Sequence, residues 1–73
     1  MKTEQKIHKI LEIINSGHIV YFTTSLKSYA VNKKTLDKFS DLGYDLFKAQ
    51  GNHIMMRSGK HWISMIGCKI TYS

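Results

Sequence analysis

Apolar residues near the start of the chain repeat with the period of an α-helix. The residues of this stripe are Ile7, Ile10, Leu11 and Ile14. They stand at i, i+3, i+4 and i+7, so they share one helix face. Thr3 precedes the stripe as a candidate N-cap, and residues 15–17 (Asn-Ser-Gly) are typical of a helix end. The pattern predicts a helix that begins after Thr3 and is closed by residues 15–17.

The next apolar segment, residues 19–24, is rich in β-branched and aromatic residues at both odd and even positions. This composition predicts a strand that is covered on both sides. Residues 25–28 form a turn into a short partner strand, Tyr29 to Val31. The strand pair is the first β unit of the predicted fold.

A second helix is predicted to start at Asn32, whose side chain can cap it. Gly43 follows at the place where helices often end on a left-handed residue. The residues expected on its buried side are Leu36, Phe39 and Leu42.

From Tyr44 onward the hydrophobic period changes to two, and two turns define a strand register. Residues 58–61 (Ser-Gly-Lys-His) and 50–53 (Gln-Gly-Asn-His) each place glycine first of two central residues, as in a type II′ hairpin. The first turn pairs Arg57 with Trp62, and the second pairs Phe47 with Met56. Both registers place the same residues on one apolar face: Phe47, Ala49, Ile54, Met56, Ile63 and Met65.

Gly67 is predicted to bend or bulge the last strand, after which Cys68, Ile70 and Tyr72 share a face. The whole chain, residues 1–73, is therefore predicted to be a single α+β domain. Its expected order is α-β-β-α-β-β-β, with an antiparallel meander in the C-terminal part.

The opposite face of the meander interleaves cations and aromatic rings. Its expected residues are Tyr44, Leu46, Lys48, His53, Met55, Arg57, Trp62 and Ser64. Arg57 lies across from Trp62, so that its guanidinium can stack on the indole. Such a face suits a nucleic acid or another polyanion. It equally suits a second core face, covered by one of the two helices with Lys48 and Arg57 at the rim.

The charges favour an anionic partner. The 73 residues include 11 Lys and Arg against 5 Asp and Glu, a formal net charge of +6, and no acidic residue follows Asp45. The sheet should therefore carry a positive field. Lys33 and Lys34 begin the second helix and can form an anion site there. The alternative is that both are solvated and compensated by Asp37.

Other chemistries are disfavoured. A single cysteine, Cys68, excludes a disulfide framework and fits a reducing compartment, so we expect a cytoplasmic protein. Four histidines lack metal-ligand spacing, and no phosphate-binding loop occurs, so no metal or cofactor is expected. The longest apolar run, residues 19–22, cannot cross a membrane. Cys68 next to a histidine could form a nucleophile pair, but a buried structural thiol is favoured.

One local pattern, formed by residues 42–44 (Leu-Gly-Tyr), 51–53 (Gly-Asn-His) and 59–60 (Gly-Lys), resembles the core of HicA-type mRNA interferase toxins. The resemblance covers about 25 of 73 residues. It implies a small endoribonuclease with His53 as the catalytic residue and with Lys48 and Arg57 as phosphate contacts. The chain departs from the family in lacking its closing helix, in a shorter second turn and in the α-β-β segment that precedes the match.

We expect a small non-catalytic binding or inhibitory accessory protein. Its partner would be the acidic or nucleic-acid-binding region of a protein, such as a nucleic-acid-processing enzyme. In size and composition it is similar to small effector proteins of phages and mobile elements that inhibit host enzymes. The alternatives are direct nucleic-acid binding and, third, a HicA-like ribonuclease using His53. Open sheet edges also suit a homodimer. The expected binding residues are Lys33, Lys34, Tyr44, Lys48, Met55, Arg57, Lys60 and Trp62.

Overall fold

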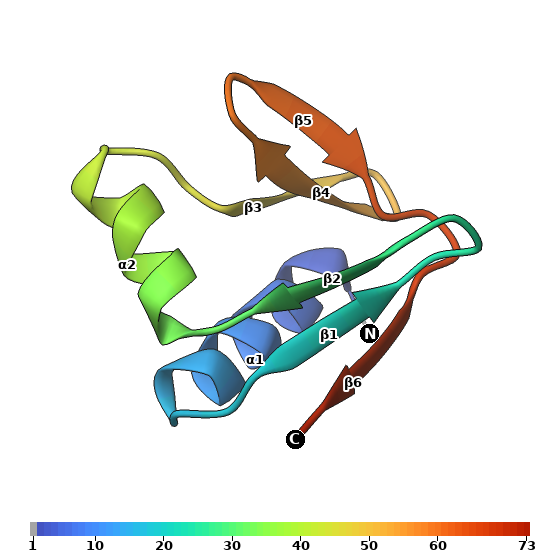
Figure 1. Ribbon diagram of the computed structural model, residues 1–73. Coiled ribbons are helices and arrows are strands. Elements are labelled where there is room, and N and C mark those ends of the chain that lie inside the picture. The colour runs from blue at the N-terminus through green and yellow to red at the C-terminus, as the bar shows by residue number, and fades with distance from the viewer. Residues whose placement is uncertain (1) are drawn as a thin grey trace.

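A computed structural model describes residues 2–73 and gives an α+β fold, which confirms the predicted class (Figure 1). The described chain contains two helices and six strands. In order these are α1 (Thr3–Asn15), β1 (Val20–Thr23), β2 (Ser28–Val31), α2 (Lys33–Asp41), β3 (Phe47–Gln50), β4 (His53–Ser58), β5 (His61–Ser64) and β6 (Lys69–Tyr72).

The strands form two antiparallel sheets, with strand orders β2-β1-β6 and β3-β4-β5. The predicted register of the second sheet is confirmed, since Phe47 pairs with Met56 and Arg57 pairs with Trp62. Gly51 and Gly59 have φ angles of 60° and 64°, and no other residue type in the described chain has a positive φ. Only the first central residue of each turn is therefore left-handed, as the type II′ geometry requires.

The chain turns at Gly67 and leaves the sheet, whereas the sequence predicts only a bend or bulge within the last strand. Gly67 has a φ of 70°, and the amide of Cys68 donates to the carbonyl of Met65 in the turn. The last segment leaves the meander and becomes β6, which pairs with β1 so that Ile70 lies beside Phe22. The order of elements is therefore α-β-β-α-β-β-β-β, because the predicted last strand divides in two.

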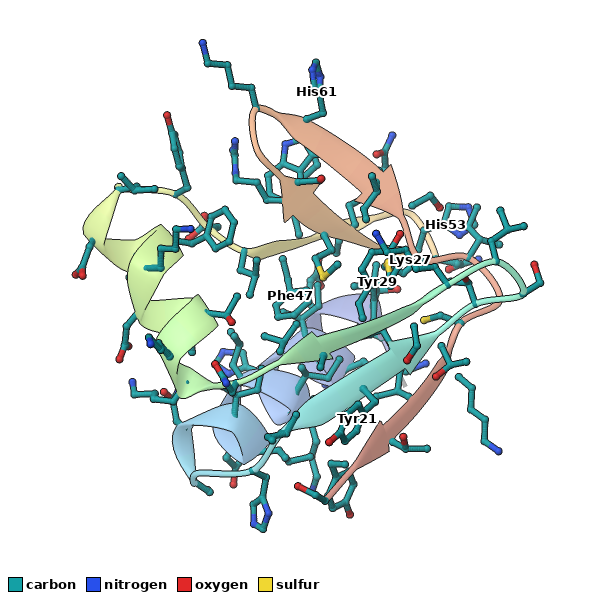
Figure 2. The ribbon with its side chains drawn as sticks, viewed as in Figure 1. Tyr21, Lys27, Tyr29, Phe47, His53 and His61 are labelled. Atoms are coloured by element: carbon teal, nitrogen blue, oxygen red, sulfur yellow. The ribbon has the colours of Figure 1, made fainter. Side chains whose placement is uncertain are left out.

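Only one face of β1 is covered, so the prediction of a strand covered on both sides is wrong. Val20 and Phe22 are fully buried, whereas Tyr21 is 36% exposed. Figure 2 shows Tyr21 on the side of its sheet away from Phe47. Both α1 and the second sheet pack on the inner side of β1, which leaves its outer side in solvent.

The core lies where α1 and the inner faces of the two sheets meet. The rings of Phe22 and Phe47 join the sheets, with centroids 5.4 Å apart. The buried residues are Ile10, Ile14, Val20, Phe22, Val31, Leu46, Phe47, Ile54, Met56 and Met65. The prediction that Leu46 lies on the outer face of the meander is wrong, because its side chain is only 4% exposed. It precedes β3, outside the regular ladder, and faces the crevice lined by Leu11 and Leu36.

The two helices begin differently from one another. Thr3 is the first residue of α1 rather than its predicted N-cap, and its hydroxyl donates to the carbonyl of Gly51 over 3.1 Å. Asn32 caps α2 as predicted, because its side chain accepts from the amide of Thr35 over 3.0 Å. No residue of α2 is buried, and Leu42, predicted on its buried side, is 59% exposed.

Candidate functional site

The outer face of the β3-β4-β5 sheet is open to solvent. Figure 1 shows this sheet at the top of the molecule, with α1 below it and α2 beyond one end. The helix that packs against β3 and β4 is α1, whereas α2 packs mainly against α1. The alternative of a second core face under a helix is therefore not what the fold adopts. We name Tyr44, Lys48, Met55, Arg57 and Trp62 the basic-aromatic face.

Two cations and two rings of this face form one stacked cluster. The guanidinium carbon of Arg57 lies 4.3 Å from the ring centroid of Tyr44 and 4.5 Å from that of Trp62. The ammonium of Lys48 lies 4.5 Å from the same indole. Each such contact contributes about 0.5–1 kcal/mol at an exposed site. The predicted stack of Arg57 on Trp62 is present, and Tyr44 and Lys48 extend it.

The turn chemistry places Arg57 and Trp62 opposite one another. They are the second pair out from the Gly59 turn, and a type II′ turn fixes the register of the strands that it joins. The Nε of Arg57 donates to the carbonyl of Asp45 over 3.3 Å, and its Nη1 donates to that of Gly59 over 3.5 Å. These bonds leave other N–H groups of the guanidinium free to meet a ligand.

Tyr44 is positioned by the end of α2. The amide of Gly43 donates to the carbonyl of Ser40, and the amide of Tyr44 donates to that of Phe39, each over 2.9 Å. These are the two bonds of a Schellman motif, with Gly43 left-handed at a φ of 78°. Gly43 is the sequence signal for this motif. The contact of Tyr44 with Arg57 has no such signal, because it joins the end of α2 to β4.

The remaining expected binding residues lie in different places. Lys60 is exposed in the turn between β4 and β5, and Met55 is half-buried beside Lys48 in the ladder. Lys33 is engaged on α2, where its ammonium lies 3.0 Å from a carboxylate oxygen of Asp37. The same ammonium donates to the side chain of Asn15 over 2.9 Å.

Lys34 also lies on α2, outside the basic-aromatic face. The ion pair of Lys33 with Asp37 agrees with the alternative in which Lys33 is compensated by that carboxylate. The start of α2 is therefore left out of the candidate site.

The histidines of the second sheet do not converge. His53 pairs with Gln50 and His61 pairs with Ser58, which puts them at alternating positions of the ladder, and both are exposed. Figure 2 shows the two imidazoles at well-separated places on the sheet. Within residues 2–73, no group of three His, Cys, Asp or Glu side chains is arranged to hold a metal ion.

A polar groove of about 400 Å³ lies beside His53. Its lining includes Thr3, Lys6, Asn52 and Cys68, with no carboxylate. Burial raises the pKa of the Cys68 thiol above its ordinary value, and the charge of Lys6 opposes that rise. The thiol is therefore protonated at neutral pH and is a poor nucleophile.

Neither a protein-family model, nor a curated protein, nor a solved structure matches this chain. The similarity to HicA-type toxins therefore depends on the short motif alone. No helix in the described part of the chain is long and apolar enough to cross a membrane.

Proposed function

We propose that this chain is a small, non-catalytic binding module whose basic-aromatic face docks on a polyanionic partner. The observation that carries the proposal is the stacked cluster of Tyr44, Arg57, Trp62 and Lys48 on a sheet face that no helix covers. Cations and ring faces held side by side offer both charge and planar contact to a ligand.

The distribution of charge supports the same function. The chain carries a formal charge of +6, and no acidic residue follows Asp45. Lys60 stands at the tip of the hairpin that bears Arg57 and Trp62. A field of one sign over this sheet would attract an anionic partner before contact, and added salt would weaken the attraction.

Two kinds of partner fit this chemistry. One is the acidic or nucleic-acid-binding region of a protein, which would make the chain an accessory or inhibitory protein, for example of a nucleic-acid-processing enzyme. The other is a nucleic acid itself. We place either interaction in the cytoplasm, because the chain has one cysteine and that cysteine is free.

A second candidate function is ribonuclease activity at His53. One observation favours it: His53 lines the same polar groove as Lys6 and Asn52, so that an imidazole lies near a cation and an amide. It ranks below binding, because the described lining of that groove offers no carboxylate to orient the imidazole. Cleavage of a single-stranded RNA that is lost in His53→Ala would establish it.

The binding function is tested by titrating the protein with two polyanions, poly-glutamate and a 15-nucleotide oligothymidylate, at low salt. We expect at least one to bind and Trp62→Ala to weaken that binding at least tenfold. The thermal midpoint of Trp62→Ala, followed by circular dichroism, should fall by several degrees, because two cation–π contacts of about 0.5–1 kcal/mol each are lost, while the variant stays folded during the titration.

The matched control is Tyr21→Ala, which removes an exposed ring from the other sheet and should leave binding unchanged. Absence of binding to both polyanions would contradict the proposal. So would equal losses of binding in the two variants.

A further inference from the structure

We infer that the ligand of the basic-aromatic face is single-stranded nucleic acid, with bases stacked on Tyr44 and Trp62. This inference rests on the proposed function, since it names the polyanion. It is carried by the ring geometry, by the area of the face and by the charges at its ends.

The rings are presented as platforms. Arg57 lies within 4.5 Å of both ring centroids and is bonded to the carbonyls of Asp45 and Gly59, so it holds Tyr44 and Trp62 in place. Tyr44 remains 43% exposed, and Trp62 is half-buried beneath Arg57 and Lys48. Exposed rings stack on bases, which all have a planar face, whereas the carboxylates of an acidic peptide would use only the cations here.

The area of the face suits a few nucleotides better than a folded protein. The longest strand, β4, has six residues, or roughly 20 Å at about 3.3 Å per residue, and three strands span roughly 15 Å. The resulting area is on the order of 300 Å². A stable protein–protein interface takes about 800 Å² from each partner.

A duplex would not use the rings. In double-stranded nucleic acid the base faces are stacked on each other, so that only phosphates and groove edges are accessible. An open sheet face that bears two aromatic rings is therefore suited to unpaired bases.

Cations also lie beyond the rings, past the two ends of β4. At one end Lys60 lies in the β4–β5 turn. At the other end His53 begins β4 on the outer face and lines the polar groove that also contains Lys6. Phosphates on either side of the stacked bases would meet Lys60 at one end and Lys6 at the other, with Lys48 between them beside Trp62.

The test compares three fluorescein-labelled probes in anisotropy titrations at one low salt concentration. They are a 15-nucleotide oligothymidylate, its duplex with oligoadenylate, and an abasic oligomer with the same phosphates. We expect the abasic and duplex probes to bind at least tenfold more weakly than the single strand. Stacking on one ring is worth about 1–3 kcal/mol, or roughly 5- to 150-fold.

Variants separate stacking from charge. Trp62→Leu should weaken binding of the oligothymidylate tenfold and leave binding of the abasic oligomer unchanged. Trp62→Phe should keep most of the parent's affinity for the oligothymidylate. Equal binding of abasic and natural oligomers would overturn the inference, as would stronger binding of poly-glutamate, and either would leave the binding function standing. Failure of every polyanion to bind would remove the proposed function itself.

Discussion

At the scale of single residues, Arg57 has two roles that a free surface arginine lacks. Two rings and two backbone carbonyls hold its guanidinium, which makes it a structural spacer as well as a positive charge. Lys60, two residues before Trp62, carries the same charge at the exposed turn. The two cations of one hairpin therefore provide a matched pair for experiment.

Arg57→Ala should lower the free energy of unfolding by about 1–2 kcal/mol, because two cation–π contacts of about 0.5–1 kcal/mol each disappear. Lys60→Ala should leave that free energy within about 0.5 kcal/mol of the parent value. Urea denaturation followed by circular dichroism measures both. Equal stability of Arg57→Ala and the parent would show that the stack does not form in solution.

Cys68 gives a prediction about pH. Burial raises its pKa and Lys6 lowers it, so the alkylation rate of the thiol by iodoacetamide should rise with pH to a midpoint above that of free cysteine. Lys6→Ala should move the midpoint further up, while Lys9→Ala on the same helix should not move it. A midpoint below that of free cysteine would contradict this environment.

The same raised pKa affects stability. Because the folded state favours the neutral thiol, its contribution is present below the unfolded pKa and is lost as pH rises through the folded pKa. Cys68→Ser should remove this part of the decline in stability at alkaline pH.

At the scale of elements, β1 divides sharply into a buried and an exposed side. Phe22 is fully buried against Phe47, whereas its neighbour Tyr21 lies on the solvent side between Ala30 and Thr71. These two adjacent aromatic residues of the central strand should therefore contribute very different amounts to the free energy of unfolding.

Phe22→Ala should cost about 3–5 kcal/mol through lost burial and the cavity left behind. A domain of 73 residues has about 4–11 kcal/mol of stability in total, so the variant should lose between roughly a quarter and all of it. Tyr21→Ala should cost much less. Thermal unfolding of the two variants measures the contrast, and similar midpoints would mean that β1 is not oriented as described.

Local sequence patterns were sufficient to predict the strand register of the meander. They were insufficient to predict which elements pack around it. Each II′ turn fixes pairing between residues close in sequence, which is why the partner of Arg57 could be predicted as Trp62. The pairing of β6 with β1 joins residues about 50 positions apart and has no local signal. The burial of Leu46 likewise depends on where the helices pack.

The candidate site was predictable to the same extent. Arg57 and Trp62 followed from the register, whereas the contact of Tyr44 with Arg57 requires α2 to end beside the sheet. The ion pair of Lys33 with Asp37 is local to α2 and was the alternative that the sequence offered, whereas the bond of Lys33 to Asn15 depends on how α1 and α2 pack.

At the scale of the whole molecule, the central feature is asymmetry. One sheet face is packed into the core, and the other carries rings and cations into solvent on a chain of net charge +6. Trp62 is the only tryptophan in the sequence, so its fluorescence reports on that face alone.

Quenching of this fluorescence by iodide and by caesium, at equal low ionic strength, measures the exposure of the indole and the sign of the field around it. We expect iodide to quench strongly and caesium weakly, because Lys48 and Arg57 lie within 4.5 Å of the ring centroid. An indole that neither ion quenches, or that caesium quenches as well as iodide does, would contradict an open cationic face.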